Sequence, residues 1–497
     1  MSDAAPATGP AADTAADTTD VVVVGGGGSG LAAASEAAQA GARVILLEKN
    51  PRVGGSTGWS VGSYSAAGTL HQRKAGIHDD TPDSHFEDLG KFAGALEPRD
   101  NRALRRILVD GAPDTLRWLM EHGVVFMGPA LEPPHSRPRM HNVVPGSKAY
   151  PYHLSRLCTR VGVDLRTSMR AVSLRMEDGR VAGVDVTDGD GKPRFIRARR
   201  AVVLTSGDYS GGREMKQRFA SAVAARSEAV NVTNTGDGQA MGMALGGTVV
   251  NGDLVHGPIL RFVAPGRPSL ISSLPPYSWV GKCATFAMAH LPQAAIRPIL
   301  MSFVTTVLGP DPGLFRAGGV LVNRTGARFT DESAKPANDL VDQPDGVGYI
   351  VLDGAKAAQF SAWPNFVSTA PNVAYAYLPD YRRNRPDIYH EAATVEALAR
   401  SLGMDAQALS ASVGRATAGP FIALGPVKSY VVLTEGGLRV SERHEVLRED
   451  GSVIDGLFAA GSAGQGGLLL YGHGHHLAWA FVSGRRAGRH AAAMSAA

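Results

Sequence analysis

A strand that runs directly into closely spaced glycines constrains this chain more than any other feature. Residues 20–24 read Asp-Val-Val-Val-Val, and residues 25–30 read Gly-Gly-Gly-Gly-Ser-Gly, which satisfies the pattern G-x-G-x-x-G. The apolar, β-branched run predicts a buried parallel strand, and the Ala-rich stretch 31–40 predicts the helix that follows it. Because the first amides of such a helix hold a pyrophosphate, the arrangement predicts a dinucleotide cofactor.

The glycines of this turn have separate expected tasks. Gly25 makes the tight turn, Gly27 lets the backbone approach a phosphate, and Gly30 lets the helix pack closely on the strand. We expect Gly28 and Ser29, which complete the turn, to supply amides to the same phosphates.

A second strand at residues 44–47 strengthens the prediction. It ends in Glu48, close to the expected distance for an acidic residue that binds the ribose hydroxyls. A carboxylate at that position disfavours a phosphorylated ribose.

A second glycine-rich turn follows and narrows the cofactor. After Lys49, residues 51–58 read Pro-Arg-Val-Gly-Gly-Ser-Thr-Gly. This stretch resembles the flavoprotein family that contains fumarate reductases, flavocytochrome c and 3-ketosteroid dehydrogenases, which bind FAD through such a double signature. The resemblance implies FAD contacts at Lys49, Gly54, Gly55, Ser56 and Thr57.

Other segments resemble the same family from about residue 20 to residue 490. They are the strand and glycine turn at 201–208, Asn-Thr-Gly-Asp-Gly at 234–238, the stretch 318–332, Thr-Glu-Gly-Gly-Leu at 434–438 and Gly-Leu-Phe-Ala-Ala-Gly at 456–461, where Ser462 replaces the usual acid. The resemblance implies further FAD contacts at Gly207, Asp237, Gly461, His476 and Leu477. It also implies an α/β fold: a Rossmann-like FAD domain of the glutathione-reductase type with a parallel sheet, plus an inserted α+β cap domain.

The length of the chain fits this division. A chain of 497 residues exceeds the size at which one core keeps growing, so at least two domains are expected. We predict a disordered extension at 1–19, an FAD-binding domain at 20–255 and 427–497, and a cap at 256–426, where proline and aromatic residues become frequent. The pocket between the two domains is the expected active site.

Composition limits partners and location. The N-terminus lacks the basic and apolar regions of a secretory signal, and no window reaches a membrane-spanning length of unbroken apolar residues. Two cysteines without a C-x-x-C pattern suit a reducing compartment, so we expect a cytoplasmic protein. The net charge of +4 comes from scattered basic residues, and we expect neither nucleic-acid binding nor stable membrane insertion.

The sequence departs from the fumarate reductases at both of that family's arginines. Alignment places Pro336, beside Lys335, where those enzymes carry the arginine acid, and Tyr471 where they carry the arginine that grips a carboxylate. Because such a clamp needs the bidentate fork of arginine, we expect a substrate other than fumarate or a close dicarboxylate.

The stretch 468–477 looks more like the corresponding segment of the 3-ketosteroid dehydrogenases. The resemblance implies that the hydroxyl of Tyr471 and the amide of Gly474 polarise a ketone oxygen. Removing a hydrogen α to a ketone builds enolate charge, and each preorganised donor contributes roughly 2.7–4 kcal/mol to its stabilisation.

The general base has four candidates. Tyr277 lies in a proline-rich loop of the cap, the region that supplies the base in the steroid enzymes, and Tyr64 follows the second glycine turn. His473 and His475 lie in the run Gly-His-Gly-His-His at 472–476. For Tyr64, the role of a half-buried core residue stays an open alternative.

The histidine run also raises the question of a metal. We expect none, since the sequence shows no paired His, Cys or carboxylate spacing elsewhere that supplies further ligands. No histidine lies between residues 54 and 68, where the covalent members of the family attach FAD, so we expect non-covalent FAD.

These observations predict an FAD-dependent oxidoreductase acting on CH–CH groups that desaturates a cyclic or steroid-like ketone. The nearest alternative is a reductase of an enone or an unsaturated acid, fed by an electron-transfer partner. A flavin module that only passes electrons to a partner, or a nicotinamide-linked dehydrogenase, explains fewer of the motifs. The electron acceptor or donor is not encoded in any motif.

Overall fold

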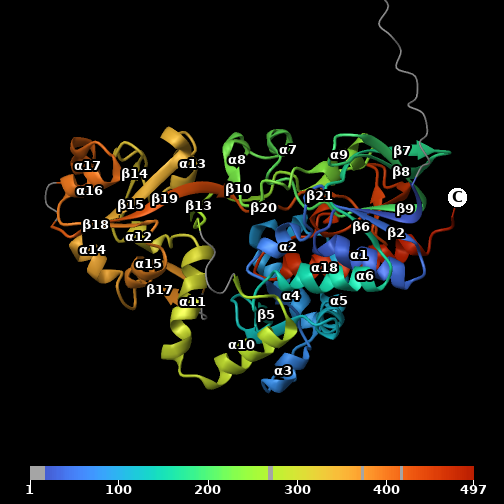
Figure 1. Ribbon diagram of the computed structural model, residues 1–497, viewed down its shortest axis with the longest axis horizontal. Coiled ribbons are helices and arrows are strands. Elements are labelled where there is room, and N and C mark those ends of the chain that lie inside the picture. The colour runs from blue at the N-terminus through green and yellow to red at the C-terminus, as the bar shows by residue number, and fades with distance from the viewer. Residues whose placement is uncertain (1–16, 267–272, 371–373, 415–417, 497) are drawn as a thin grey trace, which may run out of the picture.

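Strand β1 (Asp17–Val24) lies at the centre of the sheet on which the larger lobe is built. The structure is a computed structural model that describes residues 17–266, 273–370, 374–414 and 418–496, and Figure 1 shows two lobes side by side. The sheet runs in the order β22 (Glu445–Leu447), β23 (Val453–Ala459), β9 (Pro193–Leu204), β1, β2 (Val44–Leu47), β6 (Asp164–Arg166). The pairs joining β23, β9, β1, β2 and β6 are parallel, as the β-branched runs predict.

The start of β1 corrects one expectation. Residues 17–19 pair with residues 196–198 of β9, so the predicted disordered extension does not reach residue 19. Residues 1–16 of that prediction lie outside the described residues.

Helices α1 (Gly28–Gln39) and α18 (His475–Ala492) pack against this sheet. The predicted helix after the glycine turn is α1, and it packs along the last long helix, α18. The other helices of this lobe are α2 (Gly55–Trp59), α3 (Leu70–Lys74), α4 (Pro82–Ala93), α5 (Arg102–Glu121), α6 (Ala149–Arg160), α7 (Arg213–Phe219), α8 (Ala222–Arg226) and α9 (Asp237–Ala244), with short 3-10 turns η1 (Gly94–Arg99) and η4 (Gly461–Gly464).

Smaller sheets surround the central one. Strands β7 (Arg170–Glu177) and β8 (Arg180–Thr187) extend it as an antiparallel meander onto β9. A separate three-stranded sheet contains β3 (Ser63–Ser65), β5 (Met140–Val144) and β4 (Val125–Ala130). Two-stranded pairs join β11 (Val249–Val250) with β21 (Gly437–Leu438), and β12 (Val255–His256) with β20 (Leu433–Thr434).

The smaller lobe is built on a second sheet. Its strands are β10 (Glu228–Ala229), β19 (Phe421–Val431), β15 (Val347–Leu352), β14 (Val320–Asn323), β13 (Ile259–Phe262) and β18 (Tyr389–Ala392), with a separate pair β16 (Ser368–Ala370) and β17 (Ala374–Ala376). Its helices are α10 (Ser278–His290), α11 (Gln293–Val307), α12 (Gly313–Arg316), α13 (Pro336–Leu340), α14 (Gly354–Gln359), α15 (Leu378–Asn384), α16 (Val395–Leu402) and α17 (Ala406–Val413), with the turn η3 (Pro344–Gly346). Helix α11 packs against the smaller lobe, and α10, which precedes it, lies under the larger lobe against β4 and β5 (Figure 1).

The apolar cores are separate in the two lobes. One cluster runs from Val21 to Met241 and returns from Leu438 to Ala492, whereas the clusters of the smaller lobe lie between Phe262 and Val427. Strand β19 spans residues 421–431 and so continues through the predicted boundary at 426–427. Its C-terminal end pairs with β10, which lies in the stretch 20–255 that we assigned to the FAD-binding domain. The predicted boundaries at 255 and 426 otherwise remain predictions.

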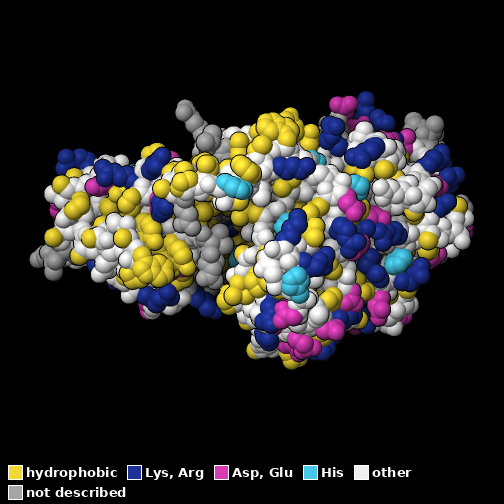
Figure 2. Space-filling view, turned by 90° about the horizontal axis from the view of Figure 1, so that it is seen from below, with side chains coloured by type: hydrophobic (Ala, Val, Ile, Leu, Met, Phe, Trp, Pro, Cys, Tyr) yellow, Lys and Arg dark blue, Asp and Glu magenta, His cyan; other side chains and the backbone are white. Residues whose placement is uncertain are grey.

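Over the described residues, the surface seen from below carries no large patch of side chains with one sign of charge. In Figure 2, Lys and Arg side chains are mixed with Asp and Glu over the larger lobe, while hydrophobic side chains gather mainly over the smaller one. Among the described residues, no helix combines the length and apolar character that crossing a bilayer requires.

Candidate active site

A cavity of about 520 Å³ lies where the two lobes meet. Most of its wall comes from the larger lobe, at the carboxyl ends of β1, β2 and β9, where a parallel α/β sheet binds its ligands. The smaller lobe adds Ile259 and Arg261 from β13, and Leu308 and Gly309 after α11. The site therefore depends on segments that are far apart in the sequence.

The first glycine turn has the geometry that the sequence predicts. Gly25 adopts φ +109° and accepts a hydrogen bond from the Thr205 hydroxyl at 2.9 Å. A Cβ on Gly30 would lie 1.8 Å from the carbonyl oxygen of Gly25, so the helix packs on the turn only with glycine there. A Cβ on Gly27 would meet no atom within 4 Å, and Gly27 lines the cavity.

The start of α1 fits a phosphate group. The N-cap residue Gly27 provides no side-chain cap and the first turn has no acidic residue; the Gly28 amide donates to the Thr57 hydroxyl at 3.1 Å, and the positive end of the helix faces the cavity. The residues present therefore fit the pyrophosphate of FAD.

Glu48 lies buried at the end of β2 and faces the cavity. Its carboxylate accepts hydrogen bonds from the amide of Gly26 and from the amide and side chain of Asn50, each at 2.8 Å. The backbone thus fixes the orientation of this carboxylate, which suits the predicted contact with ribose hydroxyls.

Thirteen of the predicted cofactor residues line this one cavity, although they come from five separate stretches of the chain. They are Gly25, Gly27, Gly28, Ser29, Glu48, Lys49, Gly55, Ser56, Thr57, Gly207, Asp237, His476 and Leu477. Lys49 binds Asp237 through an ion pair of 2.8 Å, which neutralises both charges at the wall.

Three predicted residues lie beside the wall instead of on it. Gly30 packs α1 on the first turn, and Gly54 makes the second turn at φ +136°, where its amide donates to the carbonyl of Gly26 at 2.9 Å. Gly461 adopts φ +61°, and a Cβ there would lie 2.6 Å from the Ser29 hydroxyl. Their contribution is to shape the backbone around the cavity.

Two of the predicted catalytic residues, His473 and Gly474, line the cavity. Both the backbone amide and the ring Nδ1 of His473 bind the carboxylate of Glu132, the amide at 2.9 Å. The hydrogen bond to Glu132 raises the pKa of the His473 imidazole. An imidazole paired with a carboxylate at the wall can exchange a proton with a bound substrate.

Tyr471 lies behind the wall, next to a second His–Glu group. Its ring stacks on that of His256 at 4.8 Å, and His256 Nε2 lies 2.5 Å from Glu435 Oε1. His476, which lines the cavity, lies 3.3 Å from the same oxygen. Burial acts to raise the pKa of Glu435, but the charge of His476 and the hydrogen bond from His256 hold it well below its usual range.

Tyr64 is placed in the core, away from the cavity. Its side chain is fully buried, its hydroxyl donates to the carbonyl of Ala112 at 2.9 Å, and burial raises its pKa far above the usual value. The structure thus corrects the assignment of Tyr64 as a base: it is the buried core residue that the sequence left open.

Tyr277 lies in a different surface groove. It immediately precedes α10, its side chain is 41% exposed, and its ring packs against Tyr152 at 5.4 Å. This groove is lined by Tyr152, His153, Arg156, Tyr277, Ser278, Trp279 and Lys282. The structure does not bring Tyr277 to the cavity, because the loop before α10 lies against α6 of the larger lobe.

Sequence reasoning missed Glu132, His256, Glu435 and Arg261. Glu435 lies inside the Thr-Glu-Gly-Gly-Leu segment at 434–438, which was recognised without a role for its acid. Glu132 and Arg261 stand in no motif, so only the fold places them here. Pro336 begins α13 and does not line the cavity, so it offers no replacement for an arginine acid.

Comparison with known proteins gives a family match over most of the chain. A family model described as the FAD binding domain matches residues 20–260 and 293–471. The probable fumarate reductase Ifc3 of Shewanella frigidimarina is 27% identical over 485 residues, which cover 92% of this chain and 72% of that protein. The vinyl phenol reductase of Lactiplantibacillus plantarum is 27% identical over 92% of this chain and 93% of that protein.

Solved structures agree with the fold. The open conformation of a flavocytochrome c3 fumarate reductase superposes with a TM-score of 0.72 at 25% identity, over 96% of this chain and 78% of that one. A 3-oxosteroid 1-dehydrogenase of Mycolicibacterium smegmatis is also among the relatives, at 25% identity over 86% of this chain and 88% of that protein. The matches therefore support the wider flavoprotein family and do not single out its ketosteroid dehydrogenase branch.

Proposed function

Because this chain belongs to the family described as the FAD binding domain, we propose that it reduces a carbon–carbon double bond conjugated to one polar group, with electrons from a separate donor. The chain is an FAD-dependent oxidoreductase of the fumarate reductase family that acts on CH–CH groups. When bound and reduced by that donor, FAD would supply the electron pair as a hydride. The residues of the chain bind the substrate, orient it and deliver the proton.

The observation that carries the proposal is the His473–Glu132 pair at the cavity wall. Reduction of a conjugated alkene adds a hydride at the β carbon and a proton at the α carbon. His473 gives that proton from its ring, and Glu132 holds the ring in place through the Nδ1 side. Nε2 is then the ring nitrogen that is left free, and we expect it to reach the α carbon.

The wall favours one polar group on the substrate. Among the described residues, Arg261 is the one arginine that lines the cavity. The smaller lobe also contributes the apolar side chains of Ile259 and Leu308 to the wall. A dicarboxylate is expected to need an arginine fork at each end. A ketone, a phenol or a single carboxylate on an otherwise apolar alkene suits this surface better. The first two relatives named above are both called reductases, which supports this direction.

Desaturation of a cyclic ketone remains the second candidate. One support is the 3-oxosteroid 1-dehydrogenase among the relatives. The other is Tyr471, a hydroxyl-bearing residue that stacks on His256 and directly precedes Gly472 of the cavity wall. This reaction runs through the same proton position in the opposite direction, so one assay compares both.

The test is anaerobic flavin spectroscopy in both directions. We expect dithionite-reduced protein to be reoxidised by 4-vinylphenol or by a cyclic enone, and much more slowly by fumarate. Oxidised protein should stay oxidised with saturated cyclic ketones. Bleaching by a saturated ketone, with formation of its enone, would establish the second candidate instead. Fast reoxidation by fumarate alone would overturn the proposed substrate class.

A His473→Gln variant tests the proton donor. Loss of a positioned acid is expected to slow reoxidation by the alkene roughly 10²–10⁴-fold while FAD content stays unchanged. His290→Gln on α10 is the matched control, because that histidine is exposed and its Nδ1 bonds the Phe286 carbonyl of its own helix. Equal rates in His473→Gln and the control would remove His473 from the mechanism.

A further inference from the structure

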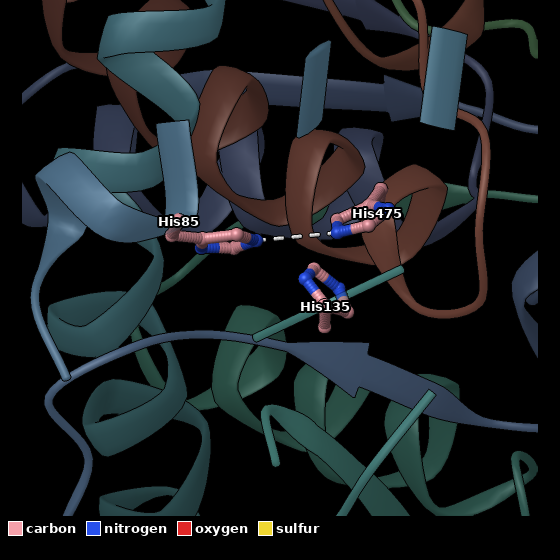
Figure 3. Close-up of side chains that lie close together, drawn as sticks. All are labelled: His85, His135 and His475. Carbon is pink, nitrogen blue, oxygen red and sulfur yellow. Dashed lines mark hydrogen bonds between the residues drawn. The ribbon is translucent and has the colours of Figure 1, made fainter. Parts of the chain in front are cut away.

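Three histidines from distant parts of the chain face one another beneath the start of α18. His85 comes from α4, His135 from the loop between β4 and β5, and His475 is the first residue of α18 (Figure 3). All three side chains are buried. Neither the family match nor the proposed reaction uses them.

Their rings are spaced as the ligands of one ion. The ring centroids are 5.4 Å apart for His85 and His135, 5.4 Å for His85 and His475, and 5.2 Å for His135 and His475. The centre of that nearly equilateral triangle is about 3.1 Å from each centroid, which matches an imidazole that binds zinc at about 2.0–2.1 Å through one nitrogen.

The nitrogen atoms support the same centre. His85 Nε2 and His475 Nε2 lie 3.2 Å apart, close to the separation of about 3.3 Å between two nitrogens that share a tetrahedral zinc ion. One candidate ligand nitrogen from each of the three rings lies within 4.8 Å of the others.

The protonation states suit metal binding. His475 Nδ1 lies 2.7 Å from the Tyr471 carbonyl and must carry the proton, so its Nε2 presents a lone pair to the centre. Burial lowers the pKa of each imidazole, to about 4 for His475 and about 2 for His135, and neutral imidazole is the form that binds a metal.

Two nitrogens of the cluster have no hydrogen-bond partner in the described structure. They are His85 Nδ1 and His135 Nε2, and both atoms are buried. A buried polar atom without a partner is costly. A metal ion at the centre gives His135 Nε2 its partner directly, whereas His85 Nδ1, on the far side of its ring, gains none from the ion.

The surroundings of His135 determine what an ion must displace. Its Nδ1 accepts from Arg139 Nη1 at 2.9 Å, and Asp88 Oδ2 lies 4.0 Å from the same nitrogen. Arg139 is also held by Asp80 at 2.6 Å, and Lys91 binds the other Asp88 oxygen at 2.5 Å. When His135 binds an ion through Nε2, its proton moves to Nδ1 and the hydrogen bond from Arg139 Nη1 to Nδ1 breaks. Asp88 Oδ2, which already binds Arg139 Nη1 at 2.5 Å, becomes the acceptor of the Nδ1 proton, while Asp80 and Asp88 keep Arg139 in place.

We propose that His85, His135 and His475 bind one zinc ion, with water in the fourth position. Each ring stays neutral, with its proton on the nitrogen remote from the ion. The ion ties α4 and the β4–β5 loop to the first residue of α18. Because His473, Gly474 and His476 on either side of that residue line the cavity, zinc fixes this part of the cavity wall.

A second group, His256, Glu435 and His476, also brings three possible metal ligands together. Glu435 already accepts from His256 at 2.5 Å and from Gln465 through its second oxygen, whereas His476 Nε2 lies 3.3 Å from Glu435 Oε1 and has no hydrogen-bond partner among the described residues. It therefore serves as the comparison site in the test.

The test measures zinc in the full-length, FAD-loaded protein. After dialysis against a chelator, the protein is titrated with zinc against a chromophoric chelator, and bound metal is counted by mass spectrometry. We expect about one zinc per chain for the wild type, an increased Tm, and loss of most of that zinc in His85→Gln and in His135→Gln.

His141→Gln is the matched control. His141 is equally buried and pairs with His71 at a centroid distance of 5.2 Å, but the described residues offer no third ligand there. It should keep the zinc. Full zinc binding in His85→Gln, loss of zinc only in Glu435→Gln, or no binding by the wild type would each overturn the proposal.

A measurement on the unaltered protein covers the case in which the variants do not fold. X-ray absorption of the zinc-loaded wild type should show imidazole nitrogens at about 2.0–2.1 Å with the multiple scattering of histidine rings. A first shell of oxygen alone would contradict the three-histidine site, whatever the variants do.

Discussion

Gly27 and Gly30 stand in the same turn, but their surroundings differ completely. A Cβ on Gly30 would collide with the carbonyl of Gly25 at 1.8 Å, while a Cβ on Gly27 would point into open space at the cavity. Gly30 is thus required by the packing of the protein itself. Gly27 is required only when a ligand approaches the backbone.

Substitution of each by alanine separates these roles. We expect Gly30→Ala to lower the stability of the FAD-free protein by about 1–3 kcal/mol, through overpacking. Gly27→Ala should leave that stability within about 0.5 kcal/mol and weaken FAD binding roughly tenfold or more. Thermal unfolding without FAD and fluorescence titration with FAD measure the two effects. A Gly27→Ala protein with unchanged FAD affinity would show that the phosphates bind elsewhere.

Helix α18 connects the core of the larger lobe to the site. Gly484 and Gly488 on α18 allow its close contact with α1. A Cβ on Gly484 would lie 2.4 Å from the backbone carbonyl oxygen of Ser29, and a Cβ on Gly488 would lie 2.2 Å from that of Ala33. Arg485 on α18 binds the buried Glu36 of α1 at 2.6 Å. Both helices begin at the cavity, so their packing sets the distance between the two sides of its wall.

A Gly488→Ala variant tests this packing. The methyl group forces α18 away from the backbone of α1, and we expect a loss of about 1–3 kcal/mol in stability together with reduced FAD retention. Gly146→Ala is the control, since a Cβ there meets no atom within 4 Å. Calorimetry and the flavin-to-protein absorbance ratio provide the readouts. Equal Tm values for the two variants would mean that α18 can move away from α1 without loss of stability.

At the scale of the whole molecule, the cavity belongs to both lobes. The larger lobe supplies the turns expected to hold FAD, and the smaller lobe closes the other side with β13 and the segment after α11 (Figure 1). Cofactor binding and substrate binding are therefore expected to respond to changes in different lobes.

An Ile259→Trp variant tests this separation. Ile259 is 43% exposed on β13 at the cavity wall, and a larger side chain there should raise the KM for the alkene about tenfold by filling substrate space, without changing FAD content. Val453→Trp on β23 is the control, with 41% exposure and no position on the wall. Steady-state kinetics with a reduced dye as electron donor gives the comparison. Loss of FAD in Ile259→Trp would place the cofactor against the cap instead.

Local sequence determined the cofactor half of this protein. The strand 21–24, the helix that begins at Gly28 and the strand 44–47 follow from residues next to one another, because apolar runs and glycine turns act through neighbouring backbone. The residues that follow β1, β2 and β9 meet in one cavity because the carboxyl ends of these parallel strands lie together. The other predicted cofactor residues of the cavity lie in α2 and at the starts of α9 and α18.

Tertiary structure decided which side chains lie together near the cofactor-binding part of the chain. Tyr64 and Tyr277 are aromatic residues in suggestive segments, yet one is buried in the core and the other lies in a separate groove. Glu132 meets His473 across 341 positions, and His85 meets His475 across 390. No local pattern records such contacts, because they arise only when helices and loops pack against the sheet; the imidazole–carboxylate pair and the three-histidine cluster therefore exist only in the folded chain.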